Sequence, residues 1–72
     1  MDSKEKIGKK VWHIRRGLLK TQEEFSELID TTPETVSNVE RGVVLPSLQT
    51  VANIAEQCGV STDYLIGVNK KE

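Results

Sequence analysis

The chain has 72 residues, of which 36 % are hydrophobic and 29 % charged, so it can form one small hydrophobic core but not two domains. One cysteine and one histidine exclude an internal disulfide, a multi-cysteine metal cluster and a histidine-rich site. Because the longest apolar runs have three residues and the N-terminal segment is charged, we expect no membrane span and no signal peptide, and therefore a cytoplasmic protein.

The formal net charge of -1 conceals an uneven distribution of charge along the chain. Residues 1–20 carry seven basic and two acidic side chains, whereas residues 21–66 carry one basic and eight acidic side chains. The first segment therefore has a charge of +5 and the second a charge of -7. Any partner of this protein has to accommodate a basic first segment and an acidic body.

The first half of the chain shows two helical patterns. Apolar residues recur at steps of four, three and four, which predicts a helix over residues 4–18. A second helix is expected over residues 22–29, because Thr21 can cap its N-terminus and Glu24 can complete a capping box. The residues expected to be buried are Ile7, Val11, Ile14 and Leu18 in the first helix, and Phe25, Leu28 and Ile29 in the second.

A third helix follows after a turn of three residues. In this turn Asp30 can adopt a positive φ at modest cost, and Thr32 suits the N-cap position. Pro33 suits the first helical position, and the helix is expected to stop at Gly42. The residues of this helix that are expected to point into the core are Val36 and Val39.

A loop and a fourth helix come next. Residues 43–46 are expected to form the loop, because Pro46 disfavours a helical conformation in the residue before it. Ser47 then suits the N-cap of a helix over residues 48–58, and Gly59 ends this helix. The buried stripe expected on the fourth helix consists of Leu48, Val51, Ala55 and Cys58.

The last predicted helix is short, with Ser61 as its N-cap and Gly67 at its end. It contains the apolar residues Tyr64, Leu65 and Ile66. Since no segment alternates with a period of two residues, the sequence predicts an all-α fold of five short helices. We expect a single domain over residues 1–72, in which the basic N-terminal stretch 1–6 and the tail 68–72 are flexible.

The second and third helices have the arrangement of a helix-turn-helix motif, over about residues 21–42. Such motifs present their second helix to the major groove of DNA. Its outward residues here suit base edges, because asparagine can pair with adenine, glutamate can accept from cytosine and a threonine methyl can touch thymine. An ordinary solvated face is the alternative. These residues are Glu34, Ser37, Asn38 and Arg41, with Thr35 on the flank.

Six segments share their order and spacing with a known family. They are Ile7-Gly8, Ile14-Arg15, TQEEFSELI (21–29), VSNVERG (36–42), PSLQTVANIA (46–55) and GVSTDYLIG (59–67). Together they resemble the Cro/CI-type, or XRE-type, helix-turn-helix regulators, which include the lambdoid phage repressors and Cro proteins. The resemblance implies a lambda-repressor-like DNA-binding domain. It also implies a transcriptional regulator, in particular a repressor, that binds a near-palindromic operator in double-stranded DNA as a homodimer.

The resemblance also assigns roles to single residues. The family positions that approach base edges match Pro33, Glu34, Thr35 and Asn38. The outward Ser37 completes the set of residues expected to read bases. The resemblance implies phosphate contacts for Arg15, Gln22 and Arg41. The helix starts add Thr21 and Ser47, and the basic first segment adds Lys9 and Lys10. Free N–H groups at the starts of the second and fourth helices also favour phosphate contacts there. Lys9 and Lys10 could instead serve solubility alone. Arg15 and Glu40 match a structural ion pair that joins the first helix to the third.

Two further expectations concern partners and departures from the family. The residues expected at a dimer interface are Val44, Leu45, Val60, Thr62 and Leu65, although the loop residues among them could instead be tucked under the loop. Leu19 and Asp30 stand where glycine is common in the family. The loop 43–45 has no basic residue, which predicts modest affinity for DNA and a shallow dependence on salt.

Other functions are less compatible with the sequence. A protein-interaction module that kept the fold but lost DNA affinity is the alternative, and the acidic body supports it. An enzyme is disfavoured, because the lone His13 and Cys58 leave no set of nucleophile, base and orienting group. We expect no cofactor, metal or small-molecule ligand. Trp12 lies off the buried stripe, where it could pad the edge of the domain or contact a partner.

Overall fold

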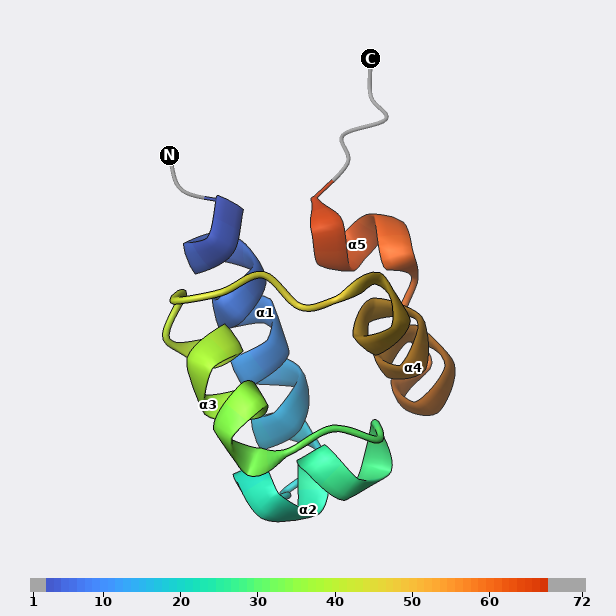
Figure 1. The fold of residues 1–72 in the computed structure, drawn as a ribbon. Coiled ribbons are helices and arrows are strands. Elements are labelled where there is room, and N and C mark those ends of the chain that lie inside the picture. Colours follow the sequence, from blue (N-terminus) through green and yellow to red (C-terminus); the bar gives the residue numbers. More distant parts are fainter. Residues whose placement is uncertain (1–2, 68–72) are drawn as a thin grey trace.

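The computed structural model describes residues 3–67, which form five helices joined by short turns and loops (Figure 1). The helices are α1 (Ser3–Gly17), α2 (Gln22–Leu28), α3 (Pro33–Glu40), α4 (Leu48–Cys58) and α5 (Thr62–Ile66). The predicted all-α fold of five short helices is confirmed. Among the described residues, no helix has the length and apolar character needed to cross a membrane.

The helix predicted over residues 4–18 begins at Ser3, within the N-terminal stretch 1–6 that was also expected to be flexible. Residues 3–6 were expected to be flexible, but they form the first turn of this helix. The acidic Glu5 suits that turn, because the first turn of a helix favours negative charge. Glu5 also packs beside Gly42 at the end of α3, since a Cβ built on this glycine would lie 3.2 Å from the Glu5 Cα. Residues 1–2 and the predicted tail 68–72 lie outside the described residues.

The starts of α2 to α5 follow from local sequence. Each begins after a serine or threonine whose side chain accepts a hydrogen bond from the backbone N–H three residues later. In α2 the bond is reciprocal, because the Glu24 N–H donates to Thr21 Oγ1 and the Thr21 N–H donates to Glu24 Oε1, each over 3.0 Å. The four caps are those predicted, namely Thr21, Thr32, Ser47 and Ser61.

The ends of α1, α2 and α3 share one backbone geometry, the Schellman motif. The chain passes through one residue with a positive φ, and the next N–H donates to the carbonyl five residues before it. These bonds run from Lys20 to Arg15, from Thr31 to Ser26 and from Val43 to Asn38. The residues with positive φ are Leu19 (59°), Asp30 (61°) and Gly42 (75°). This conformation costs a residue with a Cβ about 1–2 kcal/mol, and because aspartate tolerates it better than leucine does, Leu19 is the most strained of the three.

The core is a single cluster with a contribution from every helix. Its buried apolar residues are Ile7, Val11, Phe25, Ile29, Val36, Val39, Val51, Ile54 and Leu65. The prediction that Leu18 and Leu48 are buried was wrong, because they are 42 % and 86 % exposed. Leu18 lies beyond the last helical turn of α1, and Leu48 is the first residue of α4. Ile54, which the predicted stripe omitted, is buried one turn after Val51.

Two close contacts fix α3 and α5 against α1. A Cβ added to Gly8 would lie 2.3 Å from the carbonyl oxygen of Val39, so the absence of a side chain lets α1 and α3 approach closely. On α5, the Tyr64 carbonyl accepts a 2.8 Å hydrogen bond from Lys10 Nζ, which also lies 5.1 Å from the centre of the Tyr64 ring. Lys10 therefore ties α5 to α1.

Candidate nucleic-acid interface

A buried ion pair joins α1 to α3, the second helix of the helix-turn-helix. Arg15 Nε and Nη2 donate to the two carboxylate oxygens of Glu40 over 2.7 and 3.0 Å, and Arg15 Nη1 donates to the Lys20 carbonyl over 2.9 Å. The two charged side chains are 11 % and 4 % exposed. The hydrogen bond to Glu40 raises the pKa of Arg15 and outweighs burial, which lowers it. Arg15 is therefore charged and faces the protein interior.

The same carboxylate holds the start of α2. Gln22 Nε2 donates to Glu40 Oε1 over 3.1 Å, so one side chain at the end of α3 joins α1, α2 and α3. The structure thus brings together Arg15, Gln22 and Glu40, which the sequence analysis had placed in phosphate-contacting and structural roles. With its guanidinium engaged by Glu40 and Lys20, Arg15 fits the structural role and not a phosphate contact.

The outer face of α3 carries a connected row of polar side chains. Arg41 Nη2 donates to Asn38 Oδ1, and Arg41 Nε lies 3.4 Å from Ser37 Oγ as a second donor. Spacings of three and four residues place these side chains on one side of the helix. Arg41 occupies one of the two acceptor positions of the Asn38 amide oxygen, and the other remains able to accept from a base. Sequence reasoning did not find this contact, although the spacing of Arg41 and Asn38 allows it.

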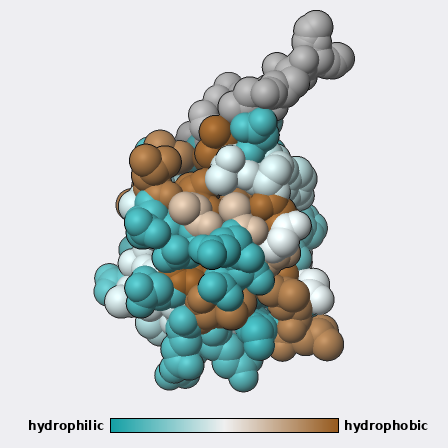
Figure 2. Space-filling view, turned by 90° about the vertical axis from the view of Figure 1, so that its right-hand side faces the viewer, coloured by the Kyte–Doolittle hydropathy of each residue, from teal (hydrophilic) through white to brown (hydrophobic). Residues whose placement is uncertain are grey.

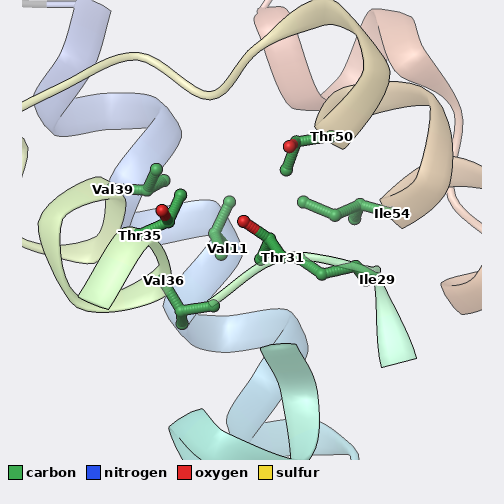
Figure 3. Close-up of a pocket in the computed structure, with 8 residues that line it drawn as sticks. All are labelled: Val11, Ile29, Thr31, Thr35, Val36, Val39, Thr50 and Ile54. Atoms are coloured by element: carbon green, nitrogen blue, oxygen red, sulfur yellow. The ribbon is translucent and has the colours of Figure 1, made fainter. Parts of the chain in front are cut away.

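The first turn of α3 holds the remaining residues expected to read bases. Pro33 and Glu34 are exposed, whereas Thr35 is half-buried. Thr32 caps this turn, because its Oγ1 accepts from the Thr35 N–H over 3.1 Å and lies 2.9 Å from Thr35 Oγ1. Figure 3 shows Thr35 at the side of an apolar cleft between α3 and α4, opposite Thr50. Thr35 therefore lies where the outer face of α3 meets this cleft.

The other residues expected to contact phosphates lie on several elements. Thr21 and Ser47 are exposed at the starts of α2 and α4, and Lys9 is exposed on α1. Lys10 is committed to the Tyr64 carbonyl, so its ammonium is already engaged within the domain. A further hydrogen bond joins α4 to the end of α2, because Asn53 Nδ2 donates to the Ile29 carbonyl over 3.1 Å.

The residues expected at a dimer interface fall into two groups. The loop residues Val44 and Leu45 are exposed, so the alternative that they are tucked under the loop is wrong. Thr62 is exposed and Val60 is half-buried against the core. Leu65 is fully buried in the core of its own domain, so its prediction as an interface residue was wrong. On the side that faces the viewer in Figure 2, hydrophobic patches alternate with hydrophilic ones.

The lone histidine and cysteine have ordinary structural surroundings. The ring of His13 packs edge-on against Trp12, with 4.9 Å between the ring centres. Cys58 is half-buried at the end of α4, and burial raises the pKa of its thiol. Within residues 3–67, no three side chains of the types that ligate metals come together.

Two short helices joined by a tight turn, with a polar outer face on the second and a buried ion pair behind it, define a helix-turn-helix domain. The sequence agrees with this geometry, because the model of the helix-turn-helix family matches residues 13–65. The chain belongs to the Cro/CI-type, or XRE-type, helix-turn-helix family of DNA-binding regulators. Searches of curated proteins and of solved structures gave no match.

Proposed function

We propose that the protein is a sequence-specific transcriptional repressor that reads a near-palindromic operator in double-stranded DNA through α3. The observation that carries this proposal is the polar outer face of α3, backed by the buried pair of Arg15 and Glu40. Recognition needs polar groups held at defined positions, and this pair fixes the helix that presents them. The residues proposed to read bases are Pro33, Glu34, Thr35, Ser37 and Asn38.

Contacts to the DNA backbone would position this helix. We assign them to Thr21, Gln22 and Ser47 at the starts of α2 and α4, and to the cations Arg41 and Lys9. Backbone N–H groups at helix starts bind phosphates well. Arg41 is the single basic side chain between residues 21 and 66, so few phosphates are neutralised and the dependence of affinity on salt should be shallow.

A homodimer would place two copies of α3 in successive major grooves, about 34 Å apart. We assign the dimer contact to the exposed loop residues Val44 and Leu45 with Val60 and Thr62. The loop residues support this assignment, since they form a run of exposed apolar side chains together with Val43. The two-fold symmetry of such a dimer is the reason to expect a near-palindromic operator.

The experiment that tests the proposal is selection of bound sites from a random double-stranded DNA library at low salt. An enriched near-palindrome is the expected result. If no sequence is enriched but the protein is retained on heparin and random DNA, the protein binds DNA without reading it. If it is not retained at all, the protein-interaction module suggested by the acidic body becomes the better function.

The role of Asn38 can be tested on the selected operator. We expect Asn38→Ala to reduce the preference for one base pair by about 1–3 kcal/mol, because the amide can pair with a base edge and alanine cannot. Binding to random DNA should change little. Lys9→Ala is the matched comparison, since loss of a phosphate contact weakens binding to all sequences equally. An equal loss on all sequences for Asn38→Ala would contradict base reading by this residue.

A further inference from the structure

One surface of α1 is not used by the fold, and Lys9 is its one residue with a proposed contact to DNA. Its helical part consists of the exposed residues Lys6, Lys9, Trp12, His13 and Arg16, and Leu18 and Leu19 follow directly after the helix. These seven residues are called the outer α1 surface below. Gly8 and Arg15, which contact α3, lie on another side of the helix. Apart from Lys9, the outer α1 surface is therefore accessible when α3 lies in a DNA groove.

Trp12 forms the centre of this surface. Its side chain is 38 % exposed, and the Arg16 guanidinium carbon lies 5.0 Å from the centre of its ring. The ring of His13 packs against its edge. Aromatic and arginine side chains held in this way are the residue types that dominate the binding energy of protein interfaces.

Leu19 is the second notable feature of this surface. It is 91 % exposed and has a positive φ, so its side chain adds backbone strain without a contact that would compensate for it. Its position is nevertheless fixed. The Leu19 N–H donates to the Arg16 carbonyl over 3.0 Å, and the next carbonyl, of Lys20, accepts from Arg15. A rigidly presented leucine at a site where glycine would be more stable points to a role outside the fold.

The charges around these apolar groups indicate the chemistry of a partner. Lys6, Lys9 and Arg16 lie on the same surface, and within the described part of α1 the one acidic residue is Glu5. A nucleic acid could use the cations but has no need of an exposed leucine. We propose that the outer α1 surface binds an acidic amphipathic segment of another protein, with its apolar side chains on Trp12 and Leu19 and its carboxylates facing the cations.

The proposal can be tested with a defined probe. The probe is a synthetic 18-residue peptide that has leucine at positions i, i+3, i+4 and i+7 and glutamate at most other positions. Because Trp12 is the sole tryptophan, its emission reports contact at this surface directly. We expect a saturable blue shift with an affinity of about 10–100 µM that weakens with salt.

Variants distinguish this surface from the rest of the protein. Leu19→Gly should weaken peptide binding about tenfold while it raises Tm by about 4–8 °C, a combination that damage to the fold would not produce. Arg16→Glu should also weaken binding, because it reverses a charge that faces the carboxylates. Leu48→Ala is the matched control, since Leu48 is equally exposed but lies at the start of α4, and it should bind the peptide normally.

Four results would overturn the proposal. The first is a Trp12 emission that does not shift, and the second is equal binding of a peptide in which lysine replaces every glutamate. The third is unchanged binding by Leu19→Gly. The fourth is a self-association, measured by sedimentation, that Leu19→Gly abolishes, because the occupant would then be a second copy of this chain. The binding of random DNA by Leu19→Gly is measured as well. If this variant loses the peptide but still binds DNA, the peptide site and the proposed DNA-binding function are separate.

Discussion

The C-terminal ends of α1 and α3 have the same backbone turn but different residues at its left-handed position. At the end of α3 this residue is Gly42, where a Cβ would meet the backbone of Glu5 at 3.2 Å. At the end of α1 it is Leu19, whose side chain points into solvent. Conformation and packing thus both require glycine at Gly42, whereas at Leu19 conformation alone disfavours the leucine. The turn after α3 packs against α1, whereas the turn after α1 presents a side chain to solvent.

The largest effect on stability is expected from Arg15, which bonds to both the end of α1 and the end of α3. Arg15→Ala removes the bond to the Lys20 carbonyl beside Leu19 and leaves Glu40 of α3 buried without its cation. We expect the free energy of unfolding to fall by about 3–5 kcal/mol, measured by urea denaturation. Arg16→Ala, an exposed neighbour, should change it by at most about 0.5 kcal/mol. Similar values for the two variants would mean that the ion pair contributes little.

The variant Gly42→Leu introduces leucine at the left-handed position after α3, as Leu19 occupies it after α1. Because strain and a clash with Glu5 now act together, we expect a loss of about 2–4 kcal/mol in the free energy of unfolding. Thermal unfolding followed by circular dichroism measures it. A loss below about 1 kcal/mol would show that the two ends are sterically equivalent after all.

The reverse exchange, Leu19→Gly, should stabilise the domain. Relief of the left-handed strain is worth about 1 kcal/mol, since no buried contact of the leucine is lost. Asp30→Gly provides the comparison at the end of α2, where a smaller gain is expected because aspartate tolerates this conformation better than leucine does. Chemical denaturation of the three proteins side by side checks the order. A destabilised Leu19→Gly would reveal that the leucine supports the fold.

The smallest effect concerns pH and Cys58. Burial raises the pKa of this thiol, so the folded state holds the proton to higher pH than the unfolded chain does. The contribution of Cys58 to stability is therefore complete below about pH 8.5, the ordinary pKa of cysteine, and declines as the pH rises above it. Tm should fall slightly more between pH 7 and pH 9.5 in the natural protein than in Cys58→Ala. Parallel curves would show that the thiol is effectively solvated.

Local signals made most of the fold predictable from the sequence. The four serine and threonine caps, Pro33 and the glycines after α3, α4 and α5 act within a few residues of the helix ends that they define. The end of α1 was misjudged by contrast, because Leu19 carries no sign of a left-handed conformation. Leu18 was consequently placed in the core, although it lies beyond the last turn of the helix.

Long-range contacts account for the remaining differences at the candidate site. Lys10 was expected to face phosphate, but its ammonium bonds to Tyr64, which lies 54 residues away in the chain. The bond from Asn53 to the Ile29 carbonyl likewise joins elements that are 24 residues apart. No local pattern predicts such pairs. The contact between Arg15 and Glu40 was anticipated because the family resemblance, and not spacing, pointed to it.

The close approach of α1 and α3 at Gly8 has a consequence for protein engineering. Any larger residue at this position would push against the Val39 carbonyl and displace α3 toward the solvent. The position of α3 against α1 thus depends on the absence of a side chain at Gly8. If α3 reads bases as proposed, attempts to retarget the domain can vary Glu34, Ser37 and Asn38, but they have to keep glycine at position 8.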